Sequence, residues 1–306
     1  MKAAKAGLHP RNRFRLGYDF PALIALSPAL GPFVKPNAHG NLSIDYAEAM
    51  AVKALNQALL RQAYGLTTWD LPPGRLCPPV PGRADYVHHL ADLLSGGDEE
   101  KIPRGKAVRV LDIGTGASAI YPLIGACEYG WSFVGTDMDA AALRWARQIV
   151  AANGQVAARI QFRQQADPAQ CFDGVVRGGE TFDLSLCNPP FHASAAEAEA
   201  GTARKLQHLG KGGGGGGKGA RPERNFGGQA NELWCAGGEL GFLRRMIEQS
   251  ALIPERCRWF TSLVSKSENL PPLRAALVKV AATEVRVIEM AQGQKKSRVL
   301  AWTFQI

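Results

Sequence analysis

An apolar strand that runs into a Gly-x-Gly turn and then a helix is the feature that most limits how this chain can fold. Val108–Ile113 is the apolar segment, Gly114-Thr115-Gly116 is the turn, and helical spacing follows over 120–127. The two glycines let the backbone turn tightly and approach a ligand, because no Cβ stands in the way. The unit predicts a parallel sheet with a cofactor site where the strand ends. No third glycine completes the Gly-x-Gly-x-x-Gly spacing, which argues against a nicotinamide oxidoreductase.

Strand and helix signals alternate from Ala107 to the C-terminus, which predicts an α/β fold with helices on both faces of a mostly parallel sheet. The expected strands are Val108–Ile113, Ser132–Thr136, Ile160–Arg163, Phe182–Cys187, Trp259–Val264, Glu284–Glu289 and Val299–Phe304. The expected helices are Ile120–Cys127, Ala140–Ala152, Gly241–Ala251 and Leu270–Lys279. The link 291–297 is too short for a helical crossover, so the last two strands should pair antiparallel. Seven strands with one antiparallel member match, by analogy, the methyltransferase variant of the Rossmann-like fold.

The first 104 residues are expected to form a basic arm and a small helical lobe against a main domain over 105–306. Apolar spacing predicts a helix over 43–63, with Ser43 as its N-cap, and a second helix that ends near Ser95. A polyglycine run at 212–217 interrupts the main domain. Polyglycine loses much backbone entropy on ordering, so 201–225 is expected to be a flexible insertion.

The net charge of +9 lies in two segments. Residues 1–20 hold five Lys or Arg against one Asp, and residues 201–225 hold six against one Glu, so the rest of the chain is neutral. Concentrated basic segments favour a polyanion such as RNA, because phosphate contacts release counterions. The alternative is that these charges only keep the protein soluble.

Composition limits the cellular setting and the kinds of site. No apolar run is long enough for a secretory signal or a bilayer span, so no membrane association is expected. The six cysteines include no Cys-x-x-Cys pair, which favours reduced thiols, a cytoplasmic protein and no metal. A monomer is expected.

The sequence Asn188-Pro189-Pro190-Phe191 follows the strand Phe182–Cys187. Two prolines fix the turn, so the Asn188 side chain and the Pro189 carbonyl point in set directions. Both oxygens can accept hydrogen bonds from one planar amine, and Phe191 can stack on its ring. These four residues are the predicted catalytic set for methyl transfer to a nitrogen. The alternative is a Pro-Pro turn that only closes the strand.

Acidic residues follow the second and third strands of the predicted sheet, 132–136 and 160–163. Asp137 ends the strand 132–136, where a carboxylate can accept both ribose hydroxyls of a nucleoside cofactor. The alternative is a helix cap, for which Asp139 is better placed. Asp167 follows the third strand and could face a cofactor adenine, although an exposed loop acid is equally compatible.

The segment Asp112–Ser118 resembles methyltransferase motif I, and the whole chain resembles the bacterial 23S rRNA adenine N6-methyltransferase family. That family is related to eukaryotic U6 RNA adenine methyltransferases. Matching segments include Leu8-His9-Pro10-Arg11-Asn12, Pro81-Gly82-Arg83-Ala84-Asp85-Tyr86, Cys187–His192 and Leu300–Phe304. The resemblance implies S-adenosylmethionine as cofactor and 23S rRNA, or a large-subunit assembly intermediate, as substrate. It also implies that Arg83 contacts the cofactor carboxylate and that Gly114, Ser118 and Asp137 bind cofactor. Asp112 and Gly116 of the same motif are predicted cofactor residues as well.

Two other functions fit the same motifs. A glutamine side chain has a planar amide that could enter the Asn-Pro-Pro-aromatic turn, so a protein glutamine N-methyltransferase is one alternative. A non-catalytic RNA-binding ribosome-assembly factor is the other, and the intact motifs argue against it. The basic segments favour RNA over a protein substrate.

Overall fold

The computed structural model describes residues 7–194, 197, 234–292 and 295–305. A seven-stranded sheet organises this part of the chain, in the order β5-β4-β3-β6-β7-β9-β8. Its strands are β3 (Arg109–Ile113), β4 (Ser132–Asp137), β5 (Ile160–Gln164), β6 (Phe182–Cys187), β7 (Cys257–Val264), β8 (Glu284–Gln292) and β9 (Lys295–Thr303). Strands β3 to β7 pair in parallel, and β9 runs antiparallel between β7 and β8. The single antiparallel strand and the final hairpin confirm the predicted fold class.

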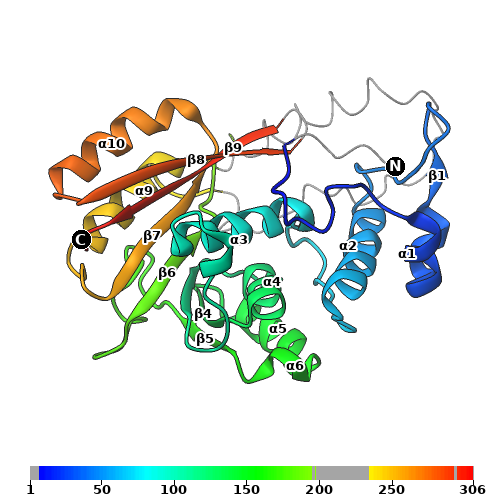
Figure 1. Cartoon of the computed structure of the whole chain (residues 1–306), viewed down its shortest axis with the longest axis horizontal. Coiled ribbons are helices and arrows are strands. Elements are labelled where there is room, and N and C mark those ends of the chain that lie inside the picture. Colours follow the sequence, from blue (N-terminus) through cyan, green and yellow to red (C-terminus); the bar gives the residue numbers. More distant parts are fainter. Residues whose placement is uncertain (1–6, 195–196, 198–233, 293–294, 306) are drawn as a thin grey trace.

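Helices cover both faces of this sheet, as Figure 1 shows. Helices α9 and α10 lie on one face, and α3, α4 and α5 lie on the other. Their bounds, with those of the smaller helices, are α1 (Phe20–Leu26), α2 (Ala49–Tyr64), α3 (Val80–Ser95), α4 (Ile120–Tyr129), α5 (Ala140–Ala151), α6 (Gly154–Ala157), α9 (Gly238–Ser250) and α10 (Leu270–Lys279).

Side-chain alternation along the strands explains the two layers. Val110 packs into the core on the α3–α5 side, whereas its neighbour Leu111 packs into the core on the α9–α10 side. In β9, Ala301 packs on the α3–α5 side and Trp302 packs on the α9–α10 side. Successive strand residues point to opposite faces, so apolar residues at both positions require cover on both sides. Of the residues that the structure describes, none belongs to a helix long and apolar enough to cross a bilayer.

The N-terminal elements differ from the sequence-based expectation in two places. The predicted N-cap Ser43 is wrong, because Ser43 lies in the short strand β2 (Leu42–Ser43), paired with β1 (Lys35–Pro36). Helix α2 begins six residues later, after Glu48. The structure also contains α1, which the sequence reading missed. Asp19 caps α1 by accepting the Ala22 N–H at 3.2 Å. The sequence did not predict α1 because a helix of seven residues is too short to show clear periodicity.

The segment 7–17, the N-terminal arm, is fastened to α3 by polar contacts. The carboxylate of Asp85 accepts the His9 backbone N–H at 2.9 Å and the Asn12 side-chain amide at 2.6 Å. Phe14 is buried in the core that joins α2–α5 to the sheet. Contacts between α3 and α4 extend that core toward the main sheet. The predicted boundary between residues 104 and 105 stays a prediction.

Two arginines of the arm are paired within the molecule. Arg11 bonds Asp92, the Tyr129 hydroxyl and the His88 carbonyl, and its side chain is 18% exposed. Arg13 bonds Glu128 through Nε at 2.8 Å. These two cations therefore hold the arm in place, which leaves fewer of the arm's charges for phosphate contacts than the sequence suggested.

Candidate active site

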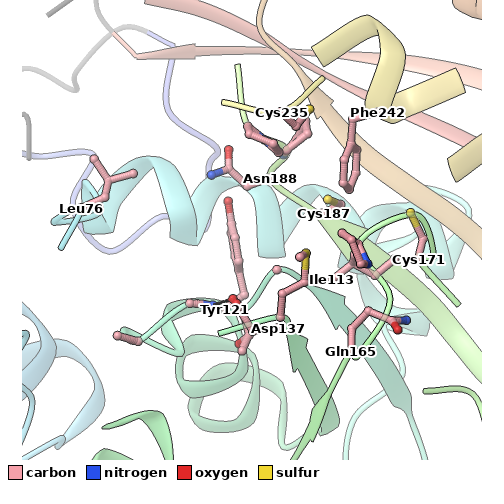
Figure 2. Close-up of a pocket in the computed structure, with 18 of the residues that line it drawn as sticks. Leu76, Ile113, Tyr121, Asp137, Gln165, Cys171, Cys187, Asn188, Cys235 and Phe242 are labelled. Atoms are coloured by element: carbon pink, nitrogen blue, oxygen red, sulfur yellow. Dashed lines mark hydrogen bonds between the residues drawn. The ribbon is translucent and has the colours of Figure 1, made fainter. Parts of the chain in front are cut away.

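A cavity of about 650 Å³ lies at the carboxyl ends of β3, β4 and β6. Strands β4 and β5 continue from β3 on one side of the sheet, whereas β7 continues from β6 on the other. Crossovers therefore leave the β3–β6 pair in opposite directions, and doubly wound sheets bind ligands at such a switch point. Figure 2 shows side chains from the ends of these strands, with Tyr121 of α4 and Phe242 of α9, around one space.

The glycine turn forms the wall of this cavity next to β3. Gly114 and Gly116 have φ angles of +76° and +65°, a region where an L side chain is strained. The N–H groups of Gly114 and Thr115 both donate to the Thr136 carbonyl at 2.9 Å. These bonds fold the turn over the end of β4. Gly114, Gly116 and Ser118, all predicted cofactor residues, line the cavity.

Asp137 ends β4 and also lines the cavity. Its Oδ2 accepts the Gly116 N–H and its Oδ1 accepts the Asp139 N–H, both at 2.9 Å. Burial raises the pKa of this carboxyl, and the two N–H donors oppose that shift. Asp139 makes the capping bonds to α5, through the Ala141 and Ala142 N–H groups. Asp137 is thus held rigidly while each carboxylate oxygen retains capacity for a further donor.

Arg83 of α3 also lines the cavity. Its Nη1 donates to the Tyr121 hydroxyl at 2.8 Å, and its guanidinium stands 5.5 Å from the Tyr121 ring centre. The buried Nε of Arg83 has no hydrogen-bond partner among the described residues. Sequence proximity alone could not place this residue here, because 30 residues of chain separate it from the glycine turn.

Asp112 lies inside β3, next to the cavity-lining Ile113, and is fully buried. Neither of its carboxylate oxygens has a hydrogen-bond partner in the part of the chain that the structure describes. Burial raises its pKa to about 7, although the nearby Thr115 hydroxyl and, less strongly, the charge of Arg83 act in the opposite direction. An unpartnered acid beside the cavity and an unpartnered guanidinium nitrogen of a lining residue fit the ammonium and carboxylate of a methionine tail.

Asn188 stands where β6 ends, and it lines the cavity with Pro189 and Pro190. Its buried Oδ1 has no hydrogen-bond partner among the described residues. Figure 2 shows the Tyr121 ring pointing toward Asn188. A buried acceptor without a partner is costly, so this oxygen is suited to a donor that arrives with a ligand.

Two of the predicted site residues lie outside the cavity lining. Phe191 is half-buried but does not line the cavity. Asp167 is exposed, and its carboxylate accepts the Ala169 N–H at 2.8 Å in its own loop. The neighbours Gln165 and Pro168 line the cavity instead. The ligand contacts of Phe191 and Asp167 stay predictions.

Two aromatic side chains that the sequence reading did not single out line the cavity: Trp234 and Phe242. Trp234 pairs with His192 through an isolated parallel β-bridge, which brings it beside the Asn-Pro-Pro turn. More than forty residues separate these partners in the chain, and no local pattern signals their pairing. The glycine-rich segment 201–225 lies outside the described residues.

One group of possible metal ligands occurs in the described residues, at His9, His89 and Asp92 and away from the cavity. His9 Nδ1 accepts the Arg11 N–H at 3.1 Å, so the ring proton lies on Nε2, which donates to Asp92 at 2.7 Å. The second Asp92 oxygen accepts from Arg11. Both ring nitrogens of His9 are thus engaged, so His9 has no lone pair to offer a metal, and its bonds to Asp92 and Arg11 serve to fasten the arm.

Comparison with known proteins places the chain among RNA-modifying enzymes. A family model described as RNA methyltransferase matches residues 2–306. The chain is 56% identical to ribosomal RNA large subunit methyltransferase F of Ectopseudomonas mendocina, over 99% of this chain and 90% of the relative. It is 54% identical to the protein of that name from Serratia proteamaculans, over 98% and 88%.

Solved structures agree with this assignment. The catalytic domain of human METTL16 in complex with the MAT2A 3′UTR hairpin 1 is similar with a TM-score of 0.81 and 32% identity, over 98% of this chain and 96% of that one. The N-terminal domain of human METTL16 in complex with SAH gives a TM-score of 0.76 and 29% identity, over 98% and 99%. This chain belongs to the RNA methyltransferase family.

Proposed function

We propose that this protein transfers the methyl group of S-adenosylmethionine to the N6 amine of an unpaired adenine in 23S rRNA, either free or in a large-subunit assembly intermediate. The observation that carries the proposal is the buried Oδ1 of Asn188. It is an acceptor without a partner among the described residues, and it shares one cavity with the glycine turn and Asp137.

The chemistry of the Asn188 turn suits an aromatic amine. The N6 lone pair of adenine is delocalised into the ring, which makes the amine a weak nucleophile. The Asn188 Oδ1 and the Pro189 carbonyl would accept its two N–H groups and favour a tetrahedral nitrogen. Bound S-adenosylmethionine supplies an electrophilic methyl on a positive sulfur, so the protein contributes mainly by positioning the amine. The methylated amine loses its proton readily to water, and no strong base is required.

Other residues in and beside the cavity suit the cofactor. Arg83 and Asp112 would meet the carboxylate and ammonium of its methionine tail, and Asp137 would accept the ribose hydroxyls. Gly114, Gly116 and Ser118 bring the backbone close enough for contact. The predicted adenine contact of Asp167 is part of this proposal, although Gln165 is nearer to the cavity.

RNA is favoured over a glutamine side chain as the methyl acceptor. The relatives are named for ribosomal RNA, and one similar structure is a complex with an RNA hairpin. An adenine within a duplex cannot present N6 to a recessed Asn188 without leaving the stack, so the target is unpaired or flipped out. A cytoplasmic monomer remains the expectation from sequence.

The direct test is transfer of tritiated methyl from S-adenosylmethionine to total RNA from cells that lack the gene. Label is expected in 23S rRNA as N6-methyladenine at one position. Matched incubations with ribosomal protein test the glutamine alternative. Label in protein and none in RNA would overturn the proposal, as would equal labelling by wild type and Asn188→Ala.

A further inference from the structure

The segment that joins α2 to α3, residues 65–79, is called the connector here, and it supplies one wall of the cavity. Leu71, Leu76 and Pro78 line that cavity, opposite the strand ends. The connector contains no helix or strand, so side-chain contacts must hold it in place. Figure 2 shows Leu76 across the space from Asp137 and Gln165.

The first half of the connector is held by contacts that do not involve Asp137 or Asp139. Lys53 of α2 pairs with Asp70 at 2.9 Å, and the Trp145 indole donates to the Asp70 carbonyl at 2.7 Å. The Trp69 indole donates to the Ser118 carbonyl at 3.0 Å. These contacts position Leu71, whereas Leu76 lies further along the connector.

Arg75 ties the second half of the connector to the end of β4. Its guanidinium bonds the Oδ2 of Asp139, and the Arg75 side chain is only 9% exposed. The other oxygen of Asp139 accepts the Ala141 N–H at 2.7 Å. Asp139 therefore serves both as the cap of α5 and as the anchor of the connector.

Asp139 is connected in turn to the residues that line the cavity. Its N–H donates to Asp137 Oδ1, and Asp137 Oδ2 accepts the Gly116 N–H. One continuous path of polar contacts thus runs from the connector through the turn after β4 to the glycine turn. Charge-assisted bonds of low exposure hold geometry more firmly than exposed surface pairs.

We propose that Arg75 and Asp139 are a positioning pair that sets the affinity for S-adenosylmethionine by holding the connector wall against the Asp137 turn. The inference rests on the proposed function, because that function names the ligand. With the pair intact, the apolar wall is in place before binding. Without it, part of the binding free energy is spent on ordering the connector, and affinity falls.

Calorimetric titration of the full chain with S-adenosylmethionine, in the absence of RNA, tests the pair. Arg75→Gln is expected to raise Kd about tenfold, the effect of losing one charge-assisted hydrogen bond. Asp139→Asn is expected to do the same, since asparagine is an equally good helix cap and only the charge is lost. The double variant should be no weaker than either single variant, because both remove one interaction. Arg75→Lys should recover part of the affinity.

Lys53→Gln is the matched control, because it breaks the ion pair at the other end of the connector. It is expected to lower the thermal midpoint modestly and to leave Kd within twofold of wild type. In steady state, Arg75→Gln should raise KM for the cofactor and leave KM for RNA and kcat unchanged. An Arg75→Gln Kd within twofold of wild type would overturn the inference, as would an equal effect of Lys53→Gln. Failure of the wild type itself to bind cofactor would refute the proposed function as well.

Discussion

The backbone N–H of Gly116 donates a hydrogen bond of 2.9 Å to Oδ2 of Asp137, which joins the turn after β3 to the end of β4. The bond orients a half-buried carboxylate in the cavity lining and leaves lone pairs for ligand donors. Asp139, two residues on, performs the capping of α5, so Asp137 is not needed for that purpose.

Replacement of Asp137 by alanine is therefore expected to weaken S-adenosylmethionine binding by about 2 kcal/mol, or roughly 30-fold, through loss of charge-assisted bonds to ribose hydroxyls. Calorimetry measures the effect. Asp45→Ala is the matched control, because its carboxylate is exposed, accepts the Ala47 N–H in its own loop and lies outside the cavity lining. An unchanged dissociation constant for Asp137→Ala would restrict that residue to a structural role.

Asn188→Ala is expected to reduce methyl transfer about 10²–10³-fold, the usual effect of deleting one acceptor or donor that acts in the transition state. The cofactor Kd should stay within a few-fold of wild type, because the proposed cofactor contacts are made by Arg83, Asp112 and Asp137 and not by Asn188. Single-turnover assays with saturating RNA separate the rate from binding. More than half of wild-type turnover in this variant would contradict the assignment.

The aromatic residues of the site can be ranked by a pair of substitutions. Stacking on one base contributes about 1–3 kcal/mol, and Trp234 lines the cavity whereas Phe191 does not. Trp234→Ala is therefore expected to raise KM for RNA about tenfold or more, with a smaller effect for Phe191→Ala. Steady-state kinetics at fixed cofactor provide the comparison. The reverse order would support the stacking role that the sequence suggested for Phe191.

The arm cation Arg11 is expected to act in folding rather than in RNA binding. Its guanidinium bonds Asp92, the Tyr129 hydroxyl and the His88 carbonyl, so Arg11→Gln should lower the free energy of unfolding by about 1–3 kcal/mol. The slope of log RNA affinity against log salt should stay the same, because no phosphate contact is lost. Urea unfolding measures the change in stability, and RNA affinity over a series of salt concentrations measures the slope. A shallower slope would show that Arg11 leaves its internal partners to bind phosphate.

The strands of the sheet could be predicted from sequence because their signal is local. In β6 (Phe182–Cys187), apolar residues alternate with Asp183 and Ser185, which is a strand pattern, and the predicted bounds agree with the structure there. The short α1 and the true start of α2 could not be predicted, since Glu48 makes no side-chain cap bond and α1 spans only seven residues. Local patterns fail where tertiary contacts decide the boundary.

The residues of the candidate site also differ in how well sequence predicts them. The glycine turn, Asp137 and Asn188 stand at strand ends, so topology brings them together without knowledge of side-chain packing. The Arg75–Asp139 pair and the place of Trp234 depend on contacts between segments more than forty residues apart. No periodicity or motif encodes such contacts. In the N-terminal arm, the sequence predicted too many cations for phosphate contacts. Arg11 and Arg13 have carboxylate partners within the fold.

Glu180, just before β6, gives a prediction about pH. Its carboxylate accepts bonds from Arg163 at 2.6 and 2.8 Å and from Arg109 at 3.1 Å, so it joins strands β5 and β3. The Arg163 hydrogen bonds are the main cause that lowers the pKa of Glu180 to about 2. A depressed pKa means that the folded state favours the carboxylate. The resulting stability is present above the ordinary glutamate pKa of about 4.3 and is lost as the pH falls toward 2.

Glu180→Gln is therefore expected to be less stable than wild type at pH 7, and the difference should shrink steadily between pH 5 and pH 2. Urea unfolding across this range measures it. Glu289→Gln is the control, because it removes one carboxylate from an exposed pair with Arg298, and such pairs contribute about 0–1 kcal/mol. A constant difference between wild type and Glu180→Gln from pH 7 to pH 2 would show that the substitution acts through packing or hydrogen-bond geometry and not through the charge.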